Sequence, residues 1–505
     1  MIVTALKLTD FRSYAAVELE LGAGATVFLG ANGQGKTNLV EAVEYLSTLS
    51  SHRVASDQPL VRSGATRAVL QARVRAGPDD PRGLTLDLEI RLGAANQARL
   101  NKAPVRPRDL LGAIRTVLFA PEDLAIVKGD PSDRRAFIDA LATSRWPRLA
   151  GVRADLERVL RQRASLLKGL SNRSTTRSNA ADTLGLWDEQ LVALGAELVA
   201  ARLDTVARLA PLYAERYATL AAVPSQVHLG YRSAVEPAWA TGSGVVERAE
   251  IEVLLAAAIE RRRDDEIARG LCLVGPQRDD LALELDGLPL KGYASHGESW
   301  SASLGLRLGS FDLLRQDGVE PVLILDDVFA ELDASRRRRL AQAIDEAQQV
   351  LLTAAVEQDL PAGLVAIRHR VVDGRVEPER TGSESVADPR FEPVSNQSRP
   401  SEPADPAVPG SGEAGGLVDD TSVPDSGGAV GLVGDAAVPG SGGAVGPVFD
   451  ALVPDSGNAG GLVDDVSVPG SGGCWPSGRR PIGPDVGTAC RNDGDRAGGP
   501  DRRRP

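Results

Sequence analysis

The chain has 505 residues and a net charge of −12, and no apolar run approaches the ~18 residues that a membrane-spanning helix needs. Its three cysteines, Cys272, Cys474 and Cys490, lie too far apart for a disulfide framework or a metal cluster, so we expect a cytoplasmic protein with no signal peptide and no membrane contact. The acidic charge is concentrated in residues 381–505, which carry −9 against −3 for residues 1–380, so total charge does not exclude a nucleic-acid partner.

The first strong pattern along the chain is a glycine-rich loop between a strand and a helix. Residues 25–29 (ATVFL) predict a buried strand, and apolar spacing predicts a helix over 38–49. The loop GANGQGKT matches the phosphate-binding pattern G-x-x-x-x-G-K-[ST] in full. Its glycines let backbone N–H groups surround a β-phosphate, Lys36 neutralises phosphate oxygens, and the Thr37 hydroxyl binds Mg²⁺. The sequence therefore predicts an ATP site at Gly30, Ala31, Asn32, Gly33, Gln34, Gly35, Lys36, Thr37 and Asn38.

Two other patterns follow the predicted phosphate-binding helix. Residues 68–100 alternate polar and apolar side chains, which predicts antiparallel strands. Helices are predicted over 152–170 and 187–220 and are joined by a polar turn at 171–180. A helical arm of this length is too short for a long coiled coil.

Arginine clusters lie on the helical stretches: Arg134 and Arg135, Arg161 and Arg163, and Arg261–Arg263. Such clusters are typical of a solvated charged face, and they also suit a phosphate backbone. Aromatic residues make up only 4% of the chain, which argues against recognition by base stacking. The sequence leaves both interpretations of the arginines open.

A second nucleotide-binding pattern appears after residue 271, where strands and helices alternate again. Residues 321–327 (PVLILDD) form an apolar strand that ends in two carboxylates, which is a Walker B motif. Asp326 would hold Mg²⁺, and Asp327 would orient the attacking water. The next segment, AELD at 330–333, is similar to the D-loop of ABC-type ATPases.

Residues 293–299 (YASHGES) open a helical run just before this Walker B strand. Serine and glycine at a helix start are the arrangement of an ABC signature, whose helix N-terminus and hydroxyl bind a γ-phosphate. A plain helix cap is the alternative, and the position between a P-loop and a Walker B motif favours the signature. Ser295, Gly297 and Glu298 are therefore predicted to bind nucleotide.

The C-terminal part has a different composition. VPGSG or VPDSG recurs every fifteen residues from Val408 to Val468, and each unit is mostly Gly, Pro, Ser, Ala and Asp. The few aliphatic residues cannot bury enough apolar surface to offset the loss of chain entropy on folding. We therefore predict a disordered acidic tail over 381–505. Repeat expansion without a specific role and a partner-binding tail are both open.

These motifs together resemble those of the RecF family, bacterial recombination mediators related to the head domains of Rad50 and SMC proteins. The resemblance covers about residues 1–380. Besides the P-loop, signature and Walker B motifs, it includes LTDFRSY (8–14), SHR (51–53), VLFAPEDL (117–124), KGDP (128–131), WDEQL (187–191) and GPQRDD (275–280).

The resemblance implies an α/β fold, an ABC-type P-loop ATPase head with a mixed sheet and an antiparallel β subdomain. The expected division is an N-terminal lobe (1–132), a helical arm (133–265), a C-terminal lobe (266–380) and the tail. ATP would close a homodimer in which each nucleotide lies between the P-loop of one copy and the signature of the other. The resemblance also places Arg12 near phosphate and Thr353 at the switch position after Walker B.

In function, the resemblance implies a nucleoid-associated protein with slow, DNA-stimulated ATPase activity. It would bind single-stranded, gapped or junction DNA and promote recombinase loading with RecO- and RecR-like partners. The chain departs from the family at Gln277, usually His, and in SHGES, often SQGQ, which places the turnover rate in question. A Rad50- or SMC-like head is one alternative, although it needs a longer arm, and a DNA-binding scaffold with a decayed ATPase is another.

Overall fold

The computed structural model describes residues 1–171, 177–221, 223–233, 235, 246–361 and 363–379, all within one compact unit of the chain, Met1–Pro393. The predicted tail therefore lies outside the described residues. Among the described helices, none has both the length and the apolar character required to cross a membrane.

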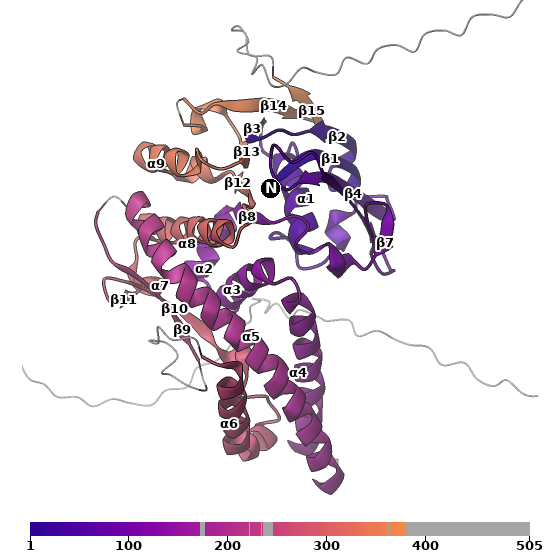
Figure 1. Ribbon diagram of the computed structural model, residues 1–505, viewed down its shortest axis with the longest axis vertical. Helices are drawn as coiled ribbons and strands as arrows, with labels where there is room; N and C mark the ends of the chain where they lie inside the picture. The colour runs from indigo at the N-terminus through magenta and orange to yellow at the C-terminus, as the bar shows by residue number, and fades with distance from the viewer. Residues whose placement is uncertain (172–176, 222, 234, 236–245, 362, 380–505) are drawn as a thin grey trace, which may run out of the picture. The chain divides into compact units, whose positions relative to one another are not determined.

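A six-stranded antiparallel sheet forms one layer, in the order β2-β1-β4-β5-β6-β7 (Figure 1). Polar and apolar residues alternate along the strands, so the apolar side chains share one buried face of the sheet. On this face Leu70 lies opposite Leu8 and Leu88, and all three are fully buried. The antiparallel strands predicted over 68–100 are confirmed. The strand bounds are β1 Ile2–Phe11, β2 Tyr14–Glu20, β4 Arg67–Arg75, β5 Gly83–Arg91, β6 Gln97–Leu100 and β7 Ala103–Val105.

A second six-stranded sheet, in the order β15-β14-β3-β13-β12-β8, is parallel except for its edge strand β15. Helix α1 (Lys36–Thr48) packs between the two sheets, and one core joins α1 residues Val40 and Leu46 to Leu70 and Ile324. Because β3, β12 and β13 run in parallel, their carboxyl ends meet at one sheet edge beside the start of α1. The strand bounds are β3 Gly24–Leu29, β8 Thr116–Phe119, β12 Val322–Asp326, β13 Gln349–Ala354, β14 Ala366–Val372 and β15 Arg375–Pro378.

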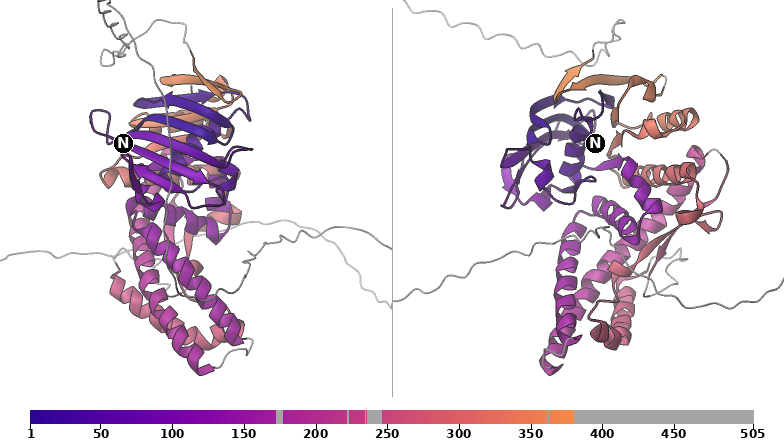
Figure 2. Two further views of the ribbon diagram at one scale, coloured as in Figure 1. Left: turned by 90° about the vertical axis from the view of Figure 1, so that its right-hand side faces the viewer. Right: turned by 180° about the vertical axis from the view of Figure 1, so that it is seen from behind.

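Helices cover the other face of the parallel sheet (Figures 1 and 2). Helix α8 packs against the long helix α5 (Arg177–Leu220), where Gly309 is needed because a Cβ there would lie 3.0 Å from the backbone nitrogen of Tyr213. The helix bounds are α2 Leu124–Lys128, α3 Pro131–Arg145, α7 Leu290–Tyr293, α8 His296–Gln316 and α9 Ala334–Ile344. Short 3₁₀ turns lie at Gln58–Leu60, Pro107–Leu110, Pro121–Asp123, Pro276–Arg278, Val328–Glu331 and Glu357–Asp359.

The helical arm consists of α4 (Leu149–Ser171), α5 (Arg177–Leu220) and α6 (Arg248–Arg269). Helix α4 ends at Ser171 and α5 begins at Arg177, so the prediction of a turn throughout 171–180 is wrong for 171 and 177–180, while 172–176 lie outside the described residues. The polar composition of 177–180 (RSNA) offered no apolar spacing from which to predict the helix.

Strand β9 (Val227–Arg232) connects the predicted arm to the rest of the unit. It pairs with β10 (Asp280–Leu285), which also pairs with β11 (Leu288–Pro289). The predicted boundaries at 132/133 and 265/266 fall inside α3 and α6, and the division into lobes stays a prediction.

The arginine clusters do not form a uniform exposed face. Arg163 is fully buried and bonds to Asp188 and Glu266, each at 2.6 Å, so it ties the three arm helices together. Arg134 is also buried and forms a two-point ion pair with Asp280. Neither predicted interpretation fits these two arginines, whereas Arg161 remains exposed.

Candidate nucleotide-binding site

The predicted P-loop connects β3 to α1. Gly33 and Gly35 have φ values of 84° and 106°, in the left-handed region that favours glycine. At Gly30 and Gly35 a Cβ would lie 2.3 Å from the Val371 carbonyl oxygen and 2.8 Å from the Ser13 hydroxyl. Sterics therefore require glycine at these positions, and the loop directs the helix N-terminus toward the sheet edge.

The side chains of Lys36, Asn38 and Gln34 hold the loop in place. The Nζ atom of Lys36 lies 3.3 Å from the Ala31 carbonyl oxygen and 3.4 Å from Asn32 Oδ1, so the ammonium group lies across its own loop. Asn38 donates to Ser13 in the β1–β2 turn at 2.9 Å. Gln34 accepts a hydrogen bond from the backbone N–H of Asp373, in the β14–β15 turn, at 2.6 Å.

Asp326, at the end of β12, joins the two nucleotide-binding motifs. Its Oδ1 accepts hydrogen bonds from Thr37 at 3.0 Å and from Thr353 at 2.6 Å. Thr353 lies opposite Asp326 in the parallel register of β12 and β13. Burial raises the pKa of Asp326, and the two hydroxyl hydrogen bonds oppose that shift.

Asp327 continues this arrangement. Its φ of 51° turns the chain sharply after β12, and its N–H donates to the Thr353 hydroxyl at 2.9 Å. Its Oδ1 is buried and has no hydrogen-bond partner in the structure. A strained residue with an unpaired carboxylate oxygen is suited to hold a water molecule beside a phosphate.

The oxygen atoms at this edge fit Mg²⁺. The Thr37 hydroxyl and the Asp326 carboxylate are adjacent, and Mg²⁺ prefers one or two protein oxygens with phosphate and water as its other ligands. No cluster of three or more His, Cys, Asp or Glu residues that could hold a metal occurs within the described ranges. One hydroxyl and one carboxylate suit a metal ion whose other ligands are nucleotide phosphates and water.

His52 is a member of this group to which the sequence motifs assigned no role. It lies in the loop after α1, and its Nδ1 contacts Glu44 Oε2 while its Nε2 lies 4.0 Å from Asp326 Oδ2. Burial alone lowers the pKa of His52, but the hydrogen bond to Glu44 and the charges of Glu44, Asp326 and Glu122 outweigh burial and raise it. The SHR motif marked this loop, but only the fold brings it to the Walker B strand.

Arg12, expected near phosphate, pairs with a buried carboxylate of the P-loop helix itself. Its φ is 52°, and its guanidinium binds both oxygens of Glu41 at 2.8 and 2.5 Å and the Pro59 carbonyl oxygen at 3.2 Å. Arg53 reaches the same Glu41 at 3.4 Å and also donates to Asn38. Two arginines thus share one buried acid, and the role of Arg12 at phosphate stays a prediction.

The predicted signature lies at the N-terminal end of α8. Ser295 caps the helix: its hydroxyl accepts from the N–H of Glu298 at 3.2 Å, and its own N–H donates to the Glu298 carboxylate at 2.7 Å. The hydrogen bond from the Ser295 backbone lowers the pKa of Glu298. The Arg336 guanidinium lies so close to Gly297 that a Cβ there would be 2.6 Å from it.

The other contacts of this helix start lead away from the P-loop of the same chain. His296 accepts from Trp300 at 3.0 Å and lies 3.3 Å from the ammonium of Lys128 on α2. Ser295 is exposed. The structure therefore assembles the P-loop, Walker B strand and Thr353 into one site and leaves the signature as a separate exposed surface.

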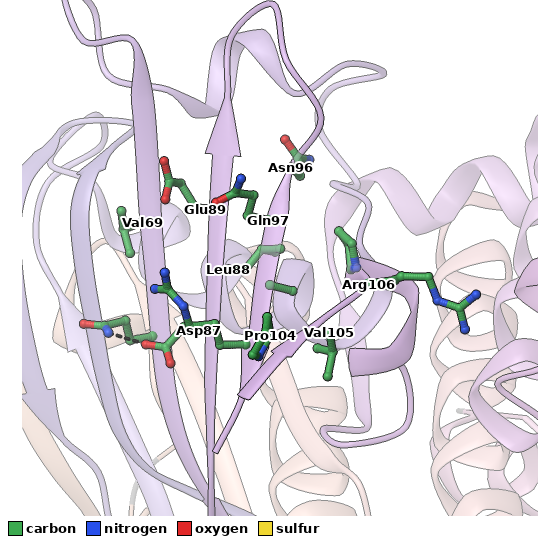
Figure 3. A pocket seen from close by; sticks show the side chains of 13 residues that line it. Val69, Asp87, Leu88, Glu89, Asn96, Gln97, Pro104, Val105 and Arg106 are labelled. Atoms are coloured by element: carbon green, nitrogen blue, oxygen red, sulfur yellow. Dashed lines mark hydrogen bonds between the residues drawn. The ribbon is translucent and has the colours of Figure 1, made fainter. Parts of the chain in front are cut away.

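A pocket on the antiparallel sheet is unrelated to this site. It lies over β4 to β7, and its lining includes Asp87 and Glu89 as well as Arg99 and Arg106 (Figure 3). Gln71 donates to Asp87 across the strands. None of its lining residues belongs to the P-loop, Walker B or signature motifs.

The fold and the site together define an ABC-type P-loop ATPase head with a helical arm. The P-loop and the Walker B strand share one edge of the parallel sheet, next to an antiparallel subdomain and a capped signature helix. The chain belongs to the RecF/RecN/SMC N-terminal domain family, whose model matches residues 2–370. Similar proteins include the DNA replication and repair protein RecF of Cutibacterium acnes, 54% identical over 387 residues, which covers 74% of this chain and 98% of the relative.

Two further similarities agree. The RecF protein of Streptomyces avermitilis is 56% identical over 380 residues, which covers 75% of this chain and all of the relative. A solved structure of the recombination mediator protein RecF-ATPrS of the RecFOR pathway matches with 25% identity and a TM-score of 0.67, over 75% of this chain and 98% of that chain. The predicted family and fold class are confirmed.

Proposed function

We propose that this chain is an ATP-dependent DNA-binding protein of RecF type, acting in DNA replication and recombinational repair. The observation that carries this proposal is the convergence of Thr37 and Thr353 on Asp326, beside a sterically required glycine loop. In this site the P-loop N–H groups and Lys36 bind the β- and γ-phosphates. Thr37 and Asp326 hold Mg²⁺, which offsets negative charge on the phosphates.

Asp327 is the residue we propose for hydrolysis, because its unpaired carboxylate oxygen is available to orient water. The site lacks the second half of an ABC-type composite site. Ser295 is exposed, Gly297 lies against Arg336 of α9, and the neighbouring His296 contacts Lys128 of α2. A second copy supplies that half. ATP binding then closes a homodimer, and slow, DNA-stimulated hydrolysis releases it.

DNA contact is proposed through exposed arginines rather than through the whole of each predicted cluster. Arg134 and Arg163 are committed to internal ion pairs, whereas Arg161 is exposed. The family relationship supports single-stranded, gapped or junction DNA as the ligand, RecO- and RecR-like partners, recombinase loading, and a nucleoid-associated cytoplasmic location.

The test is ATP-dependent dimerisation, measured by light scattering after gel filtration, together with retention on gapped DNA. We expect Lys36→Ala to lose nucleotide binding, and Ser295→Arg to bind nucleotide but remain monomeric because the arginine blocks the γ-phosphate surface. Lys7→Ala is the matched control, since Lys7 is exposed on the antiparallel sheet. Dimerisation and DNA retention at wild-type levels in both site variants would refute the proposed mechanism.

Two alternatives make different predictions. A Rad50- or SMC-like head needs a long coiled coil, but the 23 residues of α4 span only about 35 Å at the helical rise. A scaffold with a decayed ATPase would bind ATP without DNA-stimulated hydrolysis. Measuring ATP turnover with and without gapped DNA separates that scaffold from the proposed switch.

A further inference from the structure

The loop after α1 is folded back onto the helix by its own hydrogen bonds. Leu49 adopts a φ of 55° and ends α1, which reverses the chain. Ser51 donates to the buried Glu41 at 2.5 Å and accepts from the backbone N–H of Arg53 at 3.0 Å. These bonds hold the backbone on both sides of His52, and the ring itself contacts Glu44.

The two ring nitrogens of His52 have different environments. Nδ1 contacts Glu44, which lies one helical turn after Glu41, and both side chains of this pair are only 11% exposed. Nε2 is buried and has no hydrogen-bond partner. A buried polar atom without a partner costs about 1–3 kcal/mol, so its retention here needs a reason.

Nε2 lies near the Oδ2 oxygen of the Asp326 carboxylate. The hydrogen bonds from Thr37 and Thr353 to that carboxylate both end on Oδ1, and Oδ2 lies 4.0 Å from Nε2. This separation is too long for a direct hydrogen bond and close to the distance that one shared water molecule spans. Thr37 brings the Mg²⁺ position to the same carboxylate.

We propose that His52 is a positioning residue for the metal edge of the nucleotide site. Its Nε2 would form a hydrogen bond with a water molecule of the bound Mg·ATP, while Glu44 accepts the Nδ1 hydrogen and orients the ring. An outer carboxylate that fixes the tautomer and direction of a histidine is a common support for metal sites. This inference rests on the proposed ATP binding and adds a third element to the Thr37–Asp326 pair.

A purely structural role is the competing explanation, in which His52 only braces Glu44. Substitution of His52 by asparagine or glutamine separates the two roles. The side-chain amide of asparagine lies near the position of Nδ1, and that of glutamine lies near the position of Nε2. His52→Asn therefore preserves the contact with Glu44, and His52→Gln preserves a polar group at the metal edge.

The experiment measures the dissociation constant of a fluorescent ATP analogue on the full chain, with Mg²⁺ and with EDTA in place of the metal. We expect His52→Asn to reduce the Mg²⁺-dependent gain in affinity by about tenfold, the lower end for loss of a metal-supporting partner. His52→Gln should keep most of that gain, and neither variant should change binding in EDTA. His228→Asn, an exposed histidine on β9, is the matched control.

Each outcome decides between the explanations. A wild-type Mg²⁺ gain in His52→Asn overturns the inference. If His52→Gln binds the analogue more weakly than the wild type in EDTA while His52→Asn binds it normally, His52 has a structural role through Glu44. That result also overturns the inference. If the wild-type chain binds no nucleotide in either buffer, the proposed function itself fails, so this failure is distinguishable from that of the His52 inference.

Discussion

At the scale of single residues, hydroxyl groups determine the geometry of the Walker B carboxylates. Thr353 donates to Asp326 and accepts from the N–H of Asp327, so one side chain positions both acids. The register of β12 and β13 places it there, because Thr353 is the direct neighbour of Asp326. A buried acid without such donors is pushed toward its neutral form.

We predict that Thr353→Val lowers ATP turnover by about tenfold to a hundredfold and leaves nucleotide affinity within a few-fold, since valine has the same shape and lacks the hydroxyl. The unpaired Asp327 N–H should also lower the free energy of unfolding by about 1–3 kcal/mol. Steady-state kinetics and urea unfolding measure the two effects.

Thr26→Val is the control for this change. Thr26 is buried on β3, and its hydroxyl has no hydrogen-bond partner in the structure, so replacement by valine should be neutral or stabilising. Equal losses in both variants would mean that the hydroxyl of Thr353 has no special role.

At the scale of elements, the contact between α5 and α8 depends on two glycines. A Cβ at Gly305 would lie 3.3 Å from the Tyr213 ring, and one at Gly309 would lie 3.0 Å from the Tyr213 backbone nitrogen. Backbone cannot move aside as a side chain does, so the second position is the stricter one. Because α8 carries the signature at its start, this contact fixes the direction in which the signature is presented.

We predict that Gly309→Ala lowers the free energy of unfolding by about 1–3 kcal/mol through overpacking. Gly185→Ala, in the same α5 that receives Gly309, should instead stabilise the chain by about 0.5–1 kcal/mol, since a Cβ there meets nothing within 4 Å. Chemical unfolding of the two variants gives the comparison, and a stabilising Gly309→Ala would contradict the assigned contact.

The sequence predicted the elements that carry local signals and missed those that depend on packing. The glycine loop and the strand before Asp326 are read directly from spacing, and both lie where expected. The burial of Arg163 is not readable in this way, because its two acids lie on other helices, at Asp188 and Glu266. His52 is a similar case, since its partner Asp326 is 274 positions away in the sequence.

At the scale of the whole molecule, the nucleotide site occupies one edge of the described unit. Its contacts extend from Arg12 in the β1–β2 turn to Asp373 in the β14–β15 turn, so nearly the whole unit is needed to build it. These contacts all join described residues, and the predicted tail, which lies outside them, carries −9 of the −12 charge of the chain. An acidic segment repels the DNA backbone at long range and is screened by salt.

We therefore predict that removal of residues 381–505 leaves nucleotide binding and ATP-dependent dimerisation unchanged but tightens binding to gapped DNA at low salt. The gain should shrink as salt rises, because screening removes the repulsion in the full chain. Fluorescence anisotropy with labelled gapped DNA over a salt series measures it. A full-length variant with the tail acids changed to Asn and Gln is the control for length. If that neutral tail behaves like the native tail at every salt concentration, charge repulsion is not what the tail contributes.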